Sequence, residues 1–311
     1  MTYWLGVAVQ TAIFMIAILG VSVLSGFSGL YTLGHAGFMA IGAYTSAILV
    51  RTFEVPIAVG LLAGMALATL VGLFIGAPTL RLKGDYFIIA TLGIGEAIGL
   101  LAKYMIPLTN GPYGYTDYTS FRGLEAVYYV FPILLVVIIV TTFLIKSKHG
   151  RNFVALREDE IAAVTVGVNI YRYKMAAMAY SCALCGLAGG LLAHYMTNVN
   201  PTMFTGTKSN ELVIAVVLGG RGSITGVILA AAILTPLPEL LRFGSAQEWR
   251  LIIYGLTIVL MILFRPNGLM GDKEFSIRGL IRLIRRIPKA LEELNKRRKN
   301  EQQGEEESSN E

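Results

Sequence analysis

Charged residues are scarce in this sequence. Only 15% of its 311 residues are charged and 55% are hydrophobic, whereas a soluble protein carries about a quarter charged residues. Several apolar runs reach the roughly 20 residues that span a bilayer. The sequence therefore predicts an all-α, multi-pass membrane protein. The first run, Leu5–Leu24, has no Lys or Arg before it and no small-residue cleavage site after it, so we expect a retained helix and not a removable signal peptide.

Residues that carry chemistry are equally few. The chain has three His and two Cys, and it lacks the Gly-x-x-x-x-Gly-Lys-Ser/Thr, His-Glu-x-x-His and Gly-x-Ser-x-Gly motifs of nucleotide-binding, metalloprotease and hydrolase sites. Cys182 and Cys185 lie in an apolar run, where we expect two buried hydrophobic side chains and neither a metal site nor a disulfide. His149 and His194 are expected to be solvated. We therefore expect no enzymatic activity, cofactor or metal in this chain.

Basic residues concentrate in two segments. Of the 26 Lys and Arg, six lie between Lys146 and Lys174 and eleven lie from Arg265 onward. This clustering is typical of the cytoplasmic side of a plasma (inner) membrane protein, so we attribute the net charge of +6 to topology and not to nucleic-acid binding. The segment 146–174 and the tail 272–311, which is basic and then acidic, are accordingly predicted to be cytoplasmic.

Two Gly-rich stretches, Ser25–Phe38 and Gly219–Gly226, interrupt the apolar runs. Broken backbone at membrane depth is tolerated only where protein or a water-filled path surrounds it, so both stretches predict broken helices. Because both charged segments are expected on the cytoplasmic side, an even number of membrane crossings must separate them. We count about nine crossings in total, with eight to ten allowed. They form a transmembrane domain of residues 1–271. The predicted crossings are Leu5–Leu24, a helix after the first break, Pro56–Gly76, Phe87–Met105, Val127–Ile145, Met175–His194, Glu211–Gly219, Val227–Leu241 and Leu251–Phe264.

Small and polar residues inside the crossings are candidates for a translocation path. Glu96 lies in mid-crossing, and an intramembrane charge is costly unless it faces a cavity or a partner. Glu96 is interpreted either as a path residue or proton carrier, or as a hydrogen-bond acceptor for a neighbouring helix. His35 either lines the path or hydrogen-bonds to backbone at a helix end. The second helix also has a small face for close packing, which includes Gly42 and Ala43. The further path candidates are Gly34, Gly37, Phe38 and Thr91.

The segment Lys146–Lys174 is the one sizeable charged loop inside the apolar body. Its centre, Ala155–Val166, contains no Gly or Pro and predicts a single short helix outside the membrane. Such a helix is suited to docking a soluble partner.

Part of this charged loop, Glu160–Gly167, resembles the coupling loop of ABC importer permeases. The hallmark of that loop is Glu-Ala-Ala followed by a Gly four residues after the second Ala. Ala163 and Gly167 keep this spacing, whereas Ile161 departs from the pattern because it separates Glu160 from the alanines.

Four motifs in order extend the resemblance from about Leu24 to Gly271. They are similar to motifs of the branched-chain amino acid ABC transporter permeases, specifically the M-type subunit. The four motifs are Leu33–Tyr44, Arg81–Phe87, Arg157–Ala163 and Gly219–Gly226.

This resemblance implies a permease subunit that imports leucine, isoleucine and valine by alternating access. It implies as partners a second homologous permease subunit, two cytosolic ATPase subunits that bind ATP and Mg, and an extracytoplasmic solute-binding protein. The external binding protein would meet outer loops such as Pro107–Ala126. The residues expected to couple to the ATPase are Arg157, Glu158, Asp159, Glu160, Ala162, Ala163 and Gly167.

Two alternatives stay open at the level of sequence. Permeases for urea and short amides share these motifs, so another small polar solute is compatible with them. A secondary transporter of a different class would act alone and use Glu96 as its proton carrier.

Overall fold

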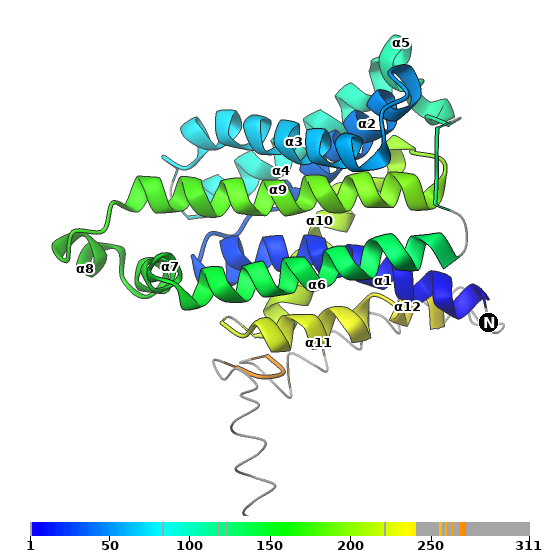
Figure 1. The fold of residues 1–311 in the computed structure, drawn as a ribbon. Helices are drawn as coiled ribbons and strands as arrows, with labels where there is room; N and C mark the ends of the chain where they lie inside the picture. Colours follow the sequence, from blue (N-terminus) through cyan, green and yellow to red (C-terminus); the bar gives the residue numbers. More distant parts are fainter. Residues whose placement is uncertain are drawn as a thin grey trace, which may run out of the picture. The chain divides into compact units, whose positions relative to one another are not determined.

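The structure, a computed structural model, describes most of the membrane domain (Figure 1). The predicted crossing Leu251–Phe264 lies mostly outside the described residues, and the tail 272–311, Lys83 and Arg221 lie outside them entirely. The described residues are 2–240 apart from 83, 117, 122, 123 and 221, together with 255, 256, 259, 263 and 268–271.

Five helices among the described residues are long and apolar enough to cross a membrane, which confirms the all-α membrane fold. Apolar side chains suit lipid, and a helix satisfies its own backbone hydrogen bonds there. These helices coincide with five predicted crossings, while the total of nine stays a prediction. They are α1 (Thr2–Val21) with its π-helical continuation η1 (Ser22–Phe27), α3 (Ile57–Thr79), α4 (Asp85–Tyr104), α6 (Leu124–Lys146) and α9 (Ile170–Met196).

The helices α1 and α9 form the interior of the bundle. In their apolar windows 78% and 72% of residues are buried, against 28%, 22% and 22% in α3, α4 and α6. The helix α2 (His35–Thr52) packs along α9 and beside α3. The outer helices α3, α4 and α6 therefore leave one face each uncovered by the described chain.

Small residues let α2, α3 and α9 approach closely. A Cβ atom added to Gly42 would collide with the backbone of Gly186 in α9, and one added to Gly189 would collide with the carbonyl of Met39. On the other side, a Cβ on Gly64 of α3 would lie 2.6 Å from the carbonyl oxygen of Gly42. The predicted small face of α2 is thus confirmed, because close backbone approach is what small residues provide in membranes.

Both predicted helix breaks are present. The first runs from residue 28 to residue 34, between η1 and α2. The second separates α10 (Gly206–Gly219) from α11 (Ile224–Leu234), where the two helices meet in a turn. Residues 268–271 return to this turn, since the Leu269 N–H donates to the Leu218 carbonyl at 2.7 Å. A short helix α12 (Leu237–Leu240) follows α11.

Short helices occupy the two ends of the long ones. Figure 1 shows α7 (Lys148–Glu158) and α8 (Glu160–Thr165) at one end, and α5 (Ile106–Thr109) at the other. We call these the α8 end and the α5 end. The turn between α3 and α4 lies at the α8 end, because the Tyr171 hydroxyl at the start of α9 reaches the Ala77 carbonyl. The 3-10 turns η2 (Gly111–Tyr113) and η3 (Pro201–Met203) complete the described elements.

The contact between α2 and α9 generates a stability prediction. Gly42→Ala should lower the free energy of unfolding by about 1–3 kcal/mol, because the new methyl group forces two backbones apart. Gly93→Ala is the matched control, since nothing lies within 4 Å of a Cβ at that mid-helix position. Thermal unfolding of the detergent-purified chain measures both, and equal melting temperatures would contradict the packing.

Candidate functional site

The predicted coupling segment is divided at Asp159. The prediction of one helix over Ala155–Val166 was wrong, because Asp159 takes an extended conformation (φ −156, ψ 111) between α7 and α8. Its carboxylate accepts hydrogen bonds from the N–H groups of Ile161 at 2.8 Å and Ala162 at 3.1 Å. These groups have no partner inside a helix, so Asp159 is the N-cap that begins α8.

The end of α8 explains the glycine of the coupling motif. Gly167 has φ +83, a left-handed conformation that favours glycine. Its N–H donates to the Val164 carbonyl at 2.9 Å, and the Val168 N–H donates to the Ala163 carbonyl at 3.0 Å. This pair of bonds satisfies the last carbonyl groups of a helix that ends in a glycine. The spacing from Ala163 to Gly167 therefore sets the length of α8.

The surface of α8 is apolar where it faces away from the protein. Ile161, Val164 and Val166 are 80%, 54% and 76% exposed, while Ala163 is buried. Exposed acids surround them at Glu158, Asp159 and Glu160. Clustered apolar side chains with a polar rim mark a protein contact.

Polar contacts join this segment to the membrane helices, and two of them come from the coupling candidates. Lys174 of α9 lies 2.6 Å from the Glu160 carboxylate at the start of α8. Arg157, in the last turn of α7, donates from Nη1 to the Gly26 carbonyl of η1 at 3.2 Å and also binds the Glu158 carboxylate. The coupling candidates are thus connected to α9 and to the first helix break.

Five of the six path candidates are buried by helix packing. A Cβ on Gly34 would lie 2.6 Å from the Thr91 carbonyl oxygen, and one on Gly37 would lie 2.9 Å from Cα of Gly95. The Thr91 hydroxyl accepts from the Leu33 N–H at 3.4 Å. These contacts bring the start of α2 against the middle of α4. His35, Phe38 and Thr91 are at most 2% exposed, and their role in a translocation path stays a prediction.

Glu96, the sixth candidate, is exposed on α4. Its Oε1 accepts from the Gly206 N–H at 2.6 Å, at the first residue of α10. A carboxylate is stabilised at a helix N-terminus, where unpaired N–H groups and the helix dipole converge. Nearby, Ser209 of α10 accepts from the Ala36 N–H in the first turn of α2 at 2.8 Å. The sequence carried no signal for Gly206 or Ser209. Their hydrogen-bond partners, Glu96 and Ala36, lie more than 100 positions away from them in the chain.

Two buried histidines connect α2 to α9. His194 is fully buried, so the expectation of a solvated side chain was wrong. Its Nδ1 lies 2.6 Å from the Thr119 carbonyl, and its Nε2 lies 2.9 Å from the Ser46 hydroxyl. Because a carbonyl only accepts, Nδ1 carries the proton and Ser46 donates to Nε2.

The second pair joins His35 Nε2 to the Ser181 hydroxyl at 2.8 Å. Both pairs therefore bridge α2 and α9, which run parallel. His149 is exposed as expected. Cys182 and Cys185 are free and buried, which confirms the prediction of two small hydrophobic side chains.

Comparison with known proteins identifies relatives along most of the chain. A family model described as the permease component of the branched-chain amino acid transport system matches residues 3–262. The high-affinity branched-chain amino acid transport system permease protein LivM of Escherichia coli K12 is 36% identical over 301 residues, covering 85% of this chain and 69% of its own. LivM of Salmonella typhimurium is 36% identical over 296 residues, with the same shares of both chains.

A second type of permease is also similar. LivH of Escherichia coli K12, another high-affinity branched-chain amino acid transport system permease protein, is 25% identical over 297 residues, covering 86% of this chain and 94% of its own. No solved structure matches the chain.

The burial of His194 generates a prediction for the α5 end. His194→Ala leaves the buried Ser46 hydroxyl without this partner, at a cost of about 1–3 kcal/mol, and releases the carbonyl of the exposed Thr119 from α9. We expect a lower melting temperature and faster proteolysis between α4 and α6. His149→Ala, on an exposed histidine, is the control. Unchanged proteolysis of His194→Ala would show that the loop is held by other contacts.

Proposed function

This chain belongs to the family of permease components of branched-chain amino acid transport systems, and we propose that separate ATPase subunits drive it through the α7–α8 segment. It is a permease subunit of an ABC importer for branched-chain amino acids. ATP and Mg would be bound by the partner subunits. The observation that carries the coupling proposal is α8 itself, a short helix capped at both ends whose outer surface is apolar.

The charge distribution supports a cytoplasmic α8 end. Basic residues outnumber acids in the stretches that flank α7 and α8, and such an excess is typical of the cytoplasmic side. The turn between α10 and α11 lies at the same end, because Gly26 of η1 neighbours both Val216 of α10 and Arg157 of α7. Residues 268–271 pack on that turn, so the tail would start on the cytoplasmic side.

The surface of α8 fits a groove on an ATPase subunit. Ile161, Val164 and Val166 would bury their exposed area in an apolar groove, where each buried aliphatic side chain contributes about 1.5–3 kcal/mol. The surrounding carboxylates of Glu158 and Asp159 would meet basic or hydrogen-bonding groups at the rim. The contact between Glu160 and Lys174 holds α8 beside the start of α9.

Two routes would carry a push on α8 into the membrane. The contact from Glu160 to Lys174 would tilt α9, and α9 would carry α2 with it through the glycine contacts and the two His–Ser pairs. In parallel, Arg157 would pull on the Gly26 carbonyl next to the first helix break. Rigid-body rocking of packed helices is the movement that alternating access needs.

The remaining proposed partners would bind other surfaces of the bundle. The α5 end, with its outer loop held to α9 by His194, would receive the loaded extracytoplasmic binding protein. A second, homologous permease subunit would complete the passage in the bilayer.

Docking through α8 is tested with Ile161→Asp. Ile161 is 80% exposed, so a charge there should leave the fold intact while removing apolar contact with the ATPase. We expect recovery of ATPase subunits with the affinity-tagged chain to fall at least ten-fold. Ile106→Asp, on an exposed residue of α5 at the opposite end, is the control. Equal recovery from both variants would refute docking through α8.

Transmission through Arg157 is tested with Arg157→Gln, which removes the charged donor to Gly26. ATPase recovery should persist, because the α8 surface is unchanged, whereas ATP-driven leucine uptake into proteoliposomes of the whole complex should fall about ten-fold, the effect of roughly 1.4 kcal/mol. Arg151→Gln, an exposed position on the same helix, is the control. Full uptake by Arg157→Gln would contradict this route.

A further inference from the structure

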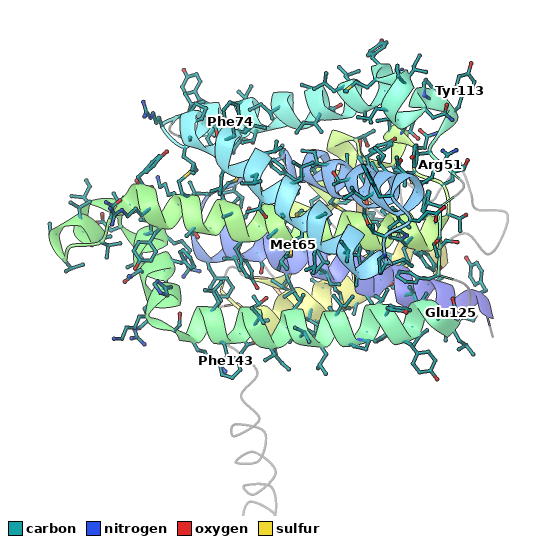
Figure 2. All side chains as sticks on the ribbon, turned by 45° about the horizontal axis from the view of Figure 1, so that its top comes forward. Arg51, Met65, Phe74, Tyr113, Glu125 and Phe143 are labelled. Atoms are coloured by element: carbon teal, nitrogen blue, oxygen red, sulfur yellow. The ribbon has the colours of Figure 1, made fainter. Side chains whose placement is uncertain are left out.

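The outer faces of α3 and α6 are suited to lipid. Their exposed side chains are large and apolar, and Figure 2 shows Phe74 of α3 and Phe143 of α6 pointing away from the bundle. These two are 81% and 73% exposed. Further exposed side chains of this kind are Leu62 and Leu70 on α3, and Leu135 and Ile139 on α6.

The outer face of α4 is different at its centre. Gly93, Glu96 and Ala97 are exposed there, and no atom lies within 4 Å of where a Cβ of Gly93 would be. Gly93 and Ala97 are one turn apart, which is the spacing at which two membrane helices pack closely. The carboxylate of Glu96 sits on the same face, and a charge that faces lipid is costly.

This carboxylate lies deep in the membrane. Eleven positions separate Asp85, the first residue of α4, from Glu96, which is about 16 Å along a helix. The hydrocarbon core is about 30 Å thick, so Glu96 is near its middle. The polar surface continues from Gly206 onto the start of α10, where Thr205, Thr207 and Asn210 are exposed. Polar groups at this depth need protein or water, and not lipid, beside them.

We propose that this α4 face, made of Gly93, Glu96 and Ala97 with the exposed start of α10, packs against the second permease subunit. The inference rests on the proposed function, which supplies that partner. Its small residues admit a helix at close range, and its polar residues are then shielded from lipid at the seam between the subunits.

The occupant we assign is a homologous permease of the same fold. LivM and LivH of Escherichia coli K12 align with 85% and 86% of this chain, so we expect a partner of either type to have a helix equivalent to α4. Equivalent faces that meet across an approximate twofold axis form a closed pair. The apolar faces of α3 and α6 then remain for lipid.

The first test uses the same substitution on two helices. Ala97→Leu should reduce recovery of the second permease with the tagged chain at least five-fold, because the larger side chain keeps the helices apart. Ala66→Leu is the matched control, on an exposed alanine of α3 that lies one turn from both Leu62 and Leu70. Recovery unchanged by Ala97→Leu, or reduced equally by Ala66→Leu, would overturn the assignment.

The second test maps the neighbour directly in the assembled complex. A photoreactive benzoylphenylalanine at position 97 should yield an adduct with the second permease, whereas one at position 70 or 136, on α3 or α6, should not. Adducts with that permease only from α3 or α6, or from none of the three positions, would overturn the α4 face. An adduct between two copies of this chain would overturn the assigned occupant.

The same samples separate this inference from the proposed function. ATPase subunits and the second permease are quantified in the wild-type complex before irradiation. Their joint absence would refute the proposed function itself. Their presence, with no effect of Ala97→Leu and no adduct at position 97, would refute only the location of the interface.

Discussion

The close contact between α2 and α9 is the constraint on which the rest of this fold depends. Lipid offers no hydrophobic force to hold two apolar helices together, so association depends on packing and on hydrogen bonds. The chain uses both: glycines at 42, 186 and 189 bring the backbones together, and His35 with Ser181 and Ser46 with His194 bind the helices above and below that contact. Because the two His–Ser hydrogen bonds fix the register of α2 against α9 at two points, neither helix slides along the other.

This constraint also explains why a broken helix is tolerated at the start of α2. Helix α2 begins beside Ser181, eleven positions after the start of α9, rather than at a membrane surface. The unpaired N–H groups of its first turn must find acceptors inside protein. Ser209 supplies one for Ala36, and Glu96 does the same for the start of α10. Polar contacts at the starts of α2 and α10 thus connect α2, α4 and α10.

Sequence reasoning identified what depends on composition and local spacing. Long apolar runs predicted the five spanning helices, and glycines predicted both breaks. The spacing from Ala163 to Gly167 matches the end of α8, because helix termination by a left-handed glycine is a local event, while the coupling role of the segment stays a prediction. The division of α7 from α8 was missed, although Asp followed by Glu-Ile-Ala has the form of an N-cap. The burial of His194 could not be predicted, since its partners Ser46 and Thr119 are distant in sequence and nothing local marks them.

The exposed features of the chain lead to one physical conclusion about its working unit. Apolar side chains are exposed on α8, and a carboxylate is exposed on the spanning helix α4. For a chain by itself, the apolar side chains would be unfavourable in water and the carboxylate would be unfavourable in lipid. Both surfaces make sense if each is covered in the assembly, α8 by a soluble subunit and α4 by a membrane-embedded one. The two surfaces are connected through α9, α2 and the crossing of α2 with α4, so a displacement of α8 by the proposed ATPase would reach the proposed contact on α4 through packed helices.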